Sequence, residues 1–221
     1  MIYILNLETA TKNCSVSISG NGATLASKEL SEEQFNHAEK LHLFIKEILE
    51  EQQLSLHDLQ AVAVSKGPGS YTGLRIGVSS AKGLCFALDI PLIAVDTLAI
   101  LAAQLQVASG AIVPMIDARR MEVFTQVFNA EKQAVSEPHA LIVTQDSLKE
   151  LGDEIHLIGD GASKCKEVLN SGQFIYHDEI IYPSANEMSR LSFEKYTQKD
   201  FADVAYFEPY YLKDFMLTTK K

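Results

Sequence analysis

The sequence predicts an α/β protein with a mixed β-sheet and helices over its faces. Two features of the residue pattern carry this prediction. Three strand-like segments follow one another at the start of the chain, as antiparallel strands do. Helical and strand-like segments then alternate, as in crossovers between parallel strands. The 221 residues allow one or two domains.

The opening strands are recognised by their apolar or alternating composition. Gly20-Asn21-Gly22 is a tight-turn signal between the second and the third of them. Ser31 and Gln34 have the spacing of a capping box, which predicts a long helix that ends near Gln52. The three strands are predicted at residues 1–8, 14–20 and 23–30.

Two further strands, each followed by a helix, complete the first half of the chain. The short apolar segment 61–66 predicts a buried strand, which ends at Gly67-Pro68-Gly69-Ser70. A helix is expected from there to about Leu88, followed by a strand at 91–95. Asp96 is suited to cap another helix, which is expected to reach about Ala108.

Ser109-Gly110 is the best candidate for a domain boundary, and it divides the chain into lobes of residues 1–109 and 110–221. The second lobe opens with a hairpin around Ala118-Arg119-Arg120. Because Pro209 disfavours helix before it, the final segment is expected to be extended and free to pack back on the first lobe. The second-lobe strands are predicted at 111–117, 121–129, 139–144, 155–160 and 174–176. Two helices are predicted near 145–151 and near 162–171. A third is predicted to begin at the capping-box pair Ser184 and Glu187 and to end at about Thr197.

The composition is globular with an acidic balance. There are 19 Lys and Arg residues against 29 Asp and Glu residues, a formal net charge of −10. Since phosphate neutralisation supplies most of the affinity for nucleic acid, we expect this chain to reach nucleic acid only through a basic partner. The chain shows neither a secretory-signal pattern nor a bilayer-spanning apolar run, so we expect a cytoplasmic protein. Cys14, Cys85 and Cys165 are far apart and are expected to be reduced, buried thiols.

The most specific motif is the glycine-rich segment 66–84, KGPGSYTGLRIGVSSAKGL. Its first glycines permit unusual backbone conformations, and the start of the following helix offers N–H groups that could hold a phosphate. The segment fits neither the Walker A pattern nor GxGxxG, so a plain strand-to-helix turn is the other interpretation. The turn at Gly159 and Gly161 is open to the same two interpretations.

Small residues line one side of the helix after this loop. They recur at every fourth position, at Gly73, Gly77, Ala81 and Cys85, and form one ridge. Such a ridge admits another backbone closely, either from the same chain or from a partner helix. The 31–52 helix has apolar residues over more than one stripe, which is typical of a partner interface or of a fully covered core. Candidate interface residues are His37, Leu41, Phe44, Ile45, Ile48, Gly73, Gly77, Ala81 and Leu84, and Gly77→Leu is expected to abolish a complex while leaving the monomer soluble.

Isolated polar side chains give weaker signals. His37 and His42 are five positions apart and cannot share one helix face as a metal-binding pair. Glu8 ends the first strand and is followed by Thr9 and Thr11, so this turn could contact a metal–phosphate. Two-metal catalysis needs several carboxylates directed at one site, and this turn supplies only one. We therefore expect no metal site on this chain.

Six segments in a fixed order cover nearly the whole chain: LNLETATKNCSVSI, KGPGSYTGLRIG, IPLIAVDTL, MIDARRMEVF, LIGDGA and PYYLKD. Together they resemble the bacterial TsaB (YeaZ) family of tRNA-modification proteins. The resemblance implies the ASKHA fold of actin and Hsp70. In that fold two RNase H-like lobes each hold a mixed five-stranded sheet flanked by helices, with the second lobe reduced here.

The resemblance also implies a function. The family is a non-catalytic subunit in the synthesis of N6-threonylcarbamoyladenosine, on tRNAs that read codons beginning with A. Its implied partners are a TsaD-type catalytic paralogue, bound through first-lobe helices, and a TsaE-type ATPase, with ATP and metal on those partners and no cofactor of its own. tRNA would be reached only through the complex, and a homodimer through the same helices is implied as well. The TsaD-type metal site uses HxxxH, in which Leu41 here replaces the second histidine.

Two positions depart from the family pattern. Glu8 stands where the family usually has Asp, and Met121 stands where Gly is common. The alternative function is a small ATP-dependent phosphotransferase of the same superfamily, whereas a metallopeptidase is disfavoured by the broken HxxxH pair. Vestigial phosphate or nucleotide loops would involve Glu8, Thr9, Thr11, Gly67, Gly69, Ser70, Arg75, Gly159 and Gly161.

Overall fold

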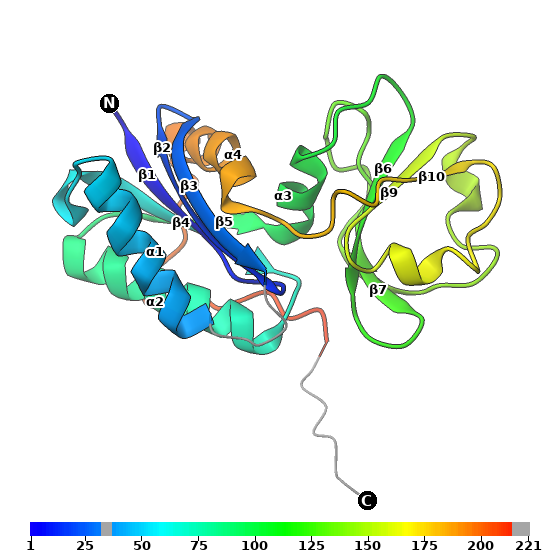
Figure 1. Ribbon diagram of the computed structural model, residues 1–221, viewed down its shortest axis with the longest axis horizontal. Coiled ribbons are helices and arrows are strands. Elements are labelled where there is room, and N and C mark those ends of the chain that lie inside the picture. Colours follow the sequence, from blue (N-terminus) through cyan, green and yellow to red (C-terminus); the bar gives the residue numbers. More distant parts are fainter. Residues whose placement is uncertain (32–36, 214–221) are drawn as a thin grey trace, which may run out of the picture.

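The chain forms two α/β lobes, each built on a five-stranded sheet (Figure 1). The computed structural model describes residues 1–31 and 37–213. The helix α3 (Thr97–Ala103) lies between the lobes and packs on the second sheet through Leu98 and Leu101. Within the described residues, none of the helices is long and apolar enough to cross a membrane.

The first sheet has the strand order β3-β2-β1-β4-β5. Its first three strands are antiparallel neighbours, whereas β1, β4 and β5 run parallel to one another. Asn21 and Gly22 both have positive φ, as a two-residue hairpin turn requires, and they join β2 to β3. The predicted strands are confirmed as β1 (Tyr3–Glu8), β2 (Asn13–Gly20), β3 (Ala23–Ser31), β4 (Leu59–Gly67) and β5 (Leu92–Asp96).

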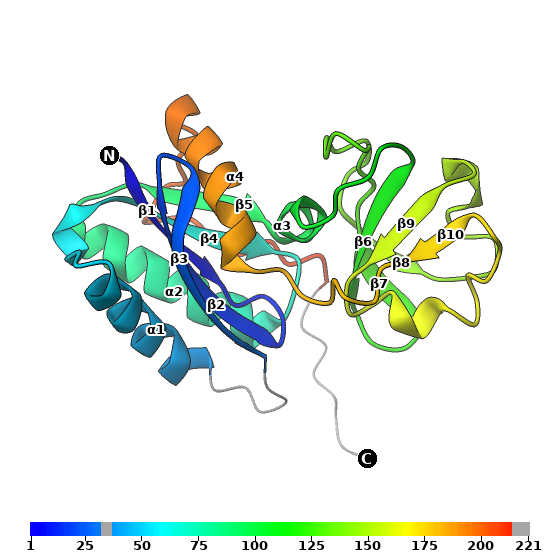
Figure 2. The ribbon, with the colours of Figure 1, turned by 45° about the horizontal axis from the view of Figure 1, so that its top comes forward.

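Helices cover both faces of the first sheet. The helices α1 (His37–Glu51) and α2 (Tyr71–Leu88) lie side by side on one face, and α4 (Ala185–Gln198) crosses the other (Figure 2). The sheet therefore separates two apolar cores, which explains why β1 and β4 are buried on both sides. Ser184 caps α4 by accepting a hydrogen bond from the Asn186 N–H, as the sequence predicts.

The second sheet repeats the topology of the first with fewer helices. Its order is β10-β9-β6-β7-β8, with β6, β7 and β8 antiparallel and β6, β9 and β10 parallel. No internal repeat is visible in the sequence, so the duplication exists in the topology alone. The strands are β6 (Ala111–Asp117), β7 (Glu122–Thr125), β8 (His139–Ile142), β9 (Ile155–Ile158) and β10 (Phe174–Tyr176).

Two helix predictions in the first lobe have wrong ends. Ser31 is the last residue of β3 and donates a hydrogen bond to Asn13 Oδ1, so it does not cap α1. Gln34, the other half of the predicted capping box, lies outside the described residues. The helix α3 ends at Ala103 instead of Ala108, and the Lys132 ammonium donates to Ala103 O at 2.7 Å, which satisfies one of the carbonyls left free at the helix end.

Two predicted second-lobe helices are single 3₁₀ turns. The segment near 145–151 contains only Lys149–Leu151, since Leu148 and Gly152 both have positive φ and interrupt a helix. The segment near 162–171 contains only Ser163–Cys165. Both segments are too short to offset the unfavourable nucleation of an α-helix. A further 3₁₀ turn, Leu56–Asp58, precedes β4.

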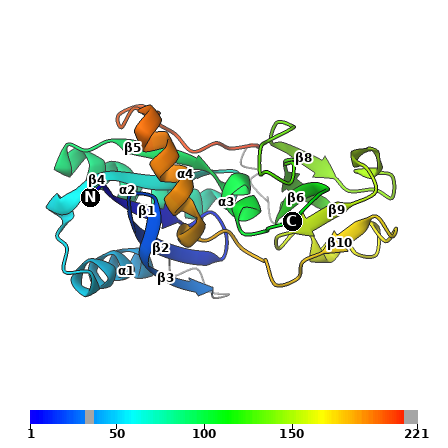
Figure 3. The ribbon, with the colours of Figure 1, turned by 90° about the horizontal axis from the view of Figure 1, so that it is seen from above.

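The C-terminal segment returns to the first lobe. Ala202 N–H donates to Leu92 O at 2.8 Å, and Tyr210 N–H donates to Lys66 O at 2.7 Å. The Lys82 ammonium, on α2, donates to two carbonyls of the same segment. Figure 3 shows this segment running along the first lobe toward the second. A boundary at residue 109 stays a prediction, although α4 and this segment lie against the first sheet and its helices.

Candidate functional site

The turn between β1 and β2 packs closely against the glycine-rich loop and the start of α2. The Ser70 N–H donates to Ala10 O at 2.6 Å, and the Thr9 hydroxyl donates to Gly73 O at 2.7 Å. Glycines make the approach possible: a Cβ at Gly69 would lie 2.4 Å from Ala10 O, and one at Gly73 would lie 2.0 Å from Thr9 O. The loop is therefore filled by the chain's own backbone.

Besides Ser70, two further N–H groups of this loop and helix start are bonded within the chain. Gly67 donates to the Thr97 hydroxyl at 3.1 Å, and Gly73 donates to the Ser70 hydroxyl at 3.3 Å. A phosphate site at a helix N-terminus needs free N–H groups directed at the ligand. The plain strand-to-helix turn, one of the two interpretations left open by the sequence, matches this geometry.

The turn at Gly159 and Gly161 is closed in the same way. Gly159 N–H donates to Ile180 O at 2.8 Å, and Gly161 N–H donates to Met115 O at 2.9 Å. A Cβ at Gly159 would lie 2.3 Å from Met115 O, so the turn sits directly on β6. These two glycines allow close packing of backbone on backbone and do not form an open cradle.

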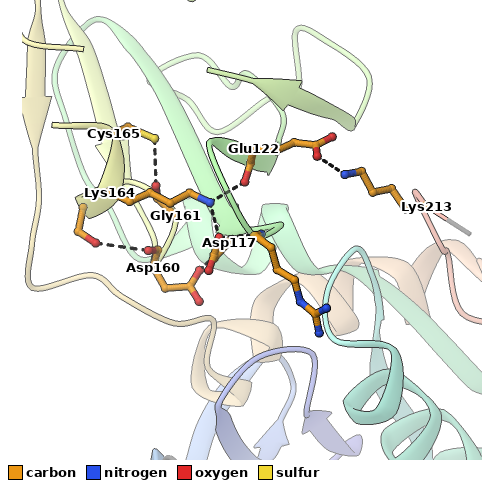
Figure 4. A network of polar contacts seen from close by, with 9 residues as sticks. Asp117, Glu122, Asp160, Gly161, Lys164, Cys165 and Lys213 are labelled. Atoms are coloured by element: carbon orange, nitrogen blue, oxygen red, sulfur yellow. Dashed lines mark hydrogen bonds and ion pairs between the residues drawn. The ribbon is translucent and has the colours of Figure 1, made fainter. Parts of the chain in front are cut away.

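Carboxylates and their partner lysines surround this second turn (Figure 4). Asp117 N–H donates to Asp160 Oδ1 at 2.9 Å. Burial raises the pKa of Asp160, although this hydrogen bond from the Asp117 N–H lowers it in part. Lys164 pairs with Asp117, and Lys213, from the C-terminal segment, pairs with Glu122. Lys164 and Lys213 are thus paired with Asp117 and Glu122, and Asp160 adds a third carboxyl group. This arrangement of carboxyl groups does not favour a nucleotide phosphate, which argues against the phosphotransferase alternative.

Glu8 is a fully buried carboxyl group at the end of β1. Its Oε1 accepts a hydrogen bond from the Ala10 N–H at 2.6 Å, whereas Oε2 has no hydrogen-bond partner among the described residues. The Ser65 hydroxyl is near enough to lower the pKa of Glu8 without reaching hydrogen-bonding geometry. Burial outweighs these effects and raises the pKa of Glu8 to about 7. The side chain faces the protein interior and is not placed to hold a metal–phosphate.

His37 and Leu41 occupy the positions of the HxxxH pair, and both point inward. His37 is 4% exposed, and its Nε2 donates to Thr11 O at 2.7 Å. This contact also buries Thr11, which the sequence placed among possible phosphate contacts. Leu41 is completely buried in the core between α1 and the sheet. Among the described residues, no group of three or more His, Cys, Asp or Glu side chains could hold a metal ion.

The small-residue ridge of α2 faces the chain's own strands. A Cβ at Gly77 would lie 2.3 Å from Thr9 Oγ1 and 3.3 Å from Val64 Cγ2, and Ala81 is fully buried. The ridge cannot also receive a partner helix, which corrects the interface prediction for Gly73, Gly77 and Ala81. Leu41, Ile45 and Ile48 belong to the same buried core, so the inward stripe of α1 is corrected with them, as is the inward-facing His37. The two other candidates, Phe44 and Leu84, are partly exposed and stay predictions.

The opposite sides of α1 and α2 carry exposed residues, and we call this surface the outer helix face. The Ser80 hydroxyl and His42 Nε2, 3.4 Å apart, join the two helices. Leu43 is 44% exposed and Phe86 is 84% exposed, and a Cβ at Gly83 would meet nothing within 4 Å. The outer helix face comprises the exposed residues His42, Leu43, Lys46, Ser79, Gly83 and Phe86. The signal for these residues was present in the helical periodicity, but the sequence does not say which stripe faces outward.

Arg75 lies on α2 beside the C-terminal segment. Its guanidinium sits 4.1 Å from the centre of the Tyr71 ring, and its Nε donates to the Tyr211 hydroxyl at 3.2 Å. The Tyr71 and Tyr211 rings are themselves 5.0 Å apart. Arg75 therefore anchors the C-terminal segment on α2, which differs from the phosphate contact considered from the sequence.

Two lobes with the same five-stranded topology, joined across a helix, define the actin/Hsp70-like ASKHA class. A family model described as TsaD, tRNA N6-adenosine threonylcarbamoyltransferase, matches residues 8–215. The tRNA threonylcarbamoyladenosine biosynthesis protein TsaB of Escherichia coli K12 is 29% identical over 220 residues, which cover 96% of this chain and 94% of that protein. The TsaB protein of Bacillus subtilis 168 is 34% identical over 187 residues, 80% of each chain.

A solved structure shows the same similarity. YeaZ from Pseudomonas aeruginosa superposes with a TM-score of 0.84 at 25% sequence identity, covering 96% of this chain and 100% of that one. The chain belongs to the TsaB (YeaZ) family, and it shares its domain with the threonylcarbamoyltransferase family that matches residues 8–215.

Proposed function

We propose that the chain is a non-catalytic subunit in the biosynthesis of tRNA N6-threonylcarbamoyladenosine, where it binds and activates a TsaD-type transferase. The observation that carries the proposal is the position of Leu41. In the TsaD-type pattern a second metal-binding histidine would stand there, and here the side chain is completely buried in the core. His37, the first residue of that pair, donates to a backbone carbonyl of the same chain.

The outer helix face is the proposed docking surface for the transferase. Protein–protein interfaces are enriched in aromatic residues and depleted of charged residues at their cores. Leu43 and Phe86 are exposed apolar side chains, and Gly83 leaves room for close approach of a partner. This assignment moves the interface of the sequence-based prediction to the other side of the same two helices. A homodimer through this face, and a TsaE-type ATPase that joins the complex, are part of the proposal.

The remaining components follow from the same scheme. ATP and metal would be held by the partner subunits. tRNA would be contacted by those subunits too, since the net charge of −10 disfavours direct binding to a polyanion.

Variants on the outer helix face test the docking surface. Leu43→Asp and Gly83→Arg are expected to weaken binding to a TsaD-type transferase by about thirtyfold or more, because each places a charge in a desolvated contact. Isothermal titration calorimetry with the purified transferase measures the change. Both positions are exposed, so the free variants are expected to stay folded. In thermal unfolding, Leu43→Asp is expected to lie close to the wild type, and Gly83→Arg at or above it, because arginine has a higher helix propensity than glycine.

Ile142→Asp is the matched control. Ile142 is 68% exposed on β8 of the second lobe, away from α1 and α2, and its replacement adds the same charge as Leu43→Asp. Binding that stays at the wild-type level in both outer-face variants, or that falls only in Ile142→Asp, would remove the outer helix face from the proposal.

A further inference from the structure

A cavity of about 430 Å³ lies where the first sheet, the second lobe and the C-terminal segment meet. Lys66 and Asp96 stand at the carboxyl ends of the parallel strands β4 and β5. In α/β sheets, the carboxyl ends of parallel strands are where ligands bind. The cavity is lined by Lys66, Asp96, Gln126, Glu137, Pro138 and Tyr210.

The C-terminal segment is fixed as one wall of this cavity. Tyr210 N–H donates to Lys66 O at 2.7 Å. Next to it, Gly67 has a φ of +115°, and a Cβ there would lie 2.5 Å from Tyr210 O. A glycine at this position is therefore needed for the wall to lie as close as it does. The cavity is therefore lined by residues from three parts of the chain: the first sheet, the second lobe and the C-terminal segment.

Gln126, a residue of the second lobe that lines the cavity, has an unused hydrogen-bond acceptor. The residue is 8% exposed, and its Nε2 donates to Ser136 O at 2.9 Å. Its Oε1 has no hydrogen-bond partner among the described residues. Leaving a buried polar atom unpaired costs about 1–3 kcal/mol, so such atoms in native proteins call for an explanation. An N–H group of a bound ligand would satisfy it.

The charges of the cavity are mixed. The Lys66 ammonium lies 2.9 Å from Asp96 Oδ1, and both side chains are about one-third exposed, so neither charge is sequestered from the cavity. Glu137 adds a second, exposed carboxylate. The lining therefore offers one cation, two carboxylates and an amide oxygen, beside apolar surface from Pro138 and Tyr210. This set is complementary to a small molecule that carries an ammonium and a carboxylate at once.

We propose that this cavity binds a free α-amino acid with a small side chain. The ligand ammonium would donate to Gln126 Oε1 and to the Glu137 carboxylate, and the ligand carboxylate would accept from the Lys66 ammonium. The proposal is independent of the docking surface, since none of its residues lies on α1 or α2.

Titration of the full chain with glycine, L-alanine, L-serine and L-threonine, followed by calorimetry and amide chemical shifts, tests this. At least one is expected to bind with a dissociation constant below 10 mM, and shifts are expected around Gln126. Ethanolamine and glycolate, which each carry only one of the two charged groups of serine, are expected to bind at least tenfold more weakly. The absence of binding by all four amino acids at 10 mM, or equal binding by ethanolamine or glycolate, would overturn the proposal.

Variants locate the site. Glu137→Gln removes an exposed charge without changing shape and is expected to reduce the affinity at least tenfold, as is Gln126→Met, which removes the acceptor oxygen. Glu131→Gln, an exposed substitution nearby in the chain but outside the cavity lining, is the matched control and is expected to leave affinity unchanged. Equal affinity in Glu137→Gln and wild type would place the ligand elsewhere and contradict the assignment.

Discussion

Replacement of Gly73 by alanine is expected to destabilise the folded chain by about 3 kcal/mol or more. The new Cβ would lie 2.0 Å from Thr9 O, a backbone atom that cannot rotate away. Either the β1–β2 turn or the start of α2 must therefore move, and the Thr9 hydroxyl would lose its bond to Gly73 O. Urea unfolding followed by circular dichroism measures the change as a lower midpoint.

Gly83→Ala is the matched control on the same helix. A Cβ at Gly83 would meet nothing within 4 Å, so this variant is expected to gain about 1 kcal/mol from the higher helix propensity of alanine. Opposite effects of one substitution at two positions of α2 would show that the small-residue ridge packs against the chain's own strands. A Gly73→Ala variant as stable as the wild type would refute that packing. By the same argument Gly77→Leu is expected to unfold the chain, and not to abolish a complex selectively.

The second large effect concerns the pH dependence of stability through Glu8. Its pKa is about 7 in the folded chain, against the ordinary value of 4.5. Below pH 4.5 the carboxyl is protonated in both states. Between pH 4.5 and 7 the unfolded chain loses the proton while the folded chain retains it, so stability falls as the pH rises through this window. The total loss is about 3 kcal/mol, and it is complete above pH 7.

Glu8→Gln isolates this contribution, because an amide of the same shape does not ionise and can still accept from the Ala10 N–H. The variant is expected to lack that part of the pH dependence and to be more stable than the wild type at pH 8. The measurement is the difference in unfolding free energy between variant and wild type at several pH values from 4 to 8. A difference that does not change with pH would show that Glu8 titrates normally.

The local pattern of residues was sufficient to predict most of the strands and two of the helices. The Asn21-Gly22 turn fixed the β2–β3 hairpin, and the start and end of α2 and α4 follow from local residues. Errors arose where tertiary contacts decide. Ser31 has the chemistry of a helix cap, yet its hydroxyl bonds Asn13 across the sheet. At the end of α3, the Ala103 carbonyl accepts a hydrogen bond from Lys132, which comes from the second lobe.

The candidate site was less predictable than the fold. The sequence identified α1 and α2 as the relevant helices and left open whether their small-residue ridge meets a strand or a partner. The ridge meets Thr9 of the same chain, and this contact exists only where β1 and α2 pack together. Likewise, the complete burial of Glu8 and the wall that Tyr210 forms beside Lys66 depend on segments far apart in the chain.

The central claim, that the chain is an obligatory non-catalytic subunit, is tested most directly by an omission assay. A TsaD-type transferase, a TsaE-type ATPase, a TsaC-type enzyme, ATP, threonine, bicarbonate and tRNA are combined with and without this chain, and the modified adenosine is quantified. We expect product only when the chain is present, and its loss when Leu43→Asp replaces the wild type. Undiminished product without the chain would contradict the proposed function.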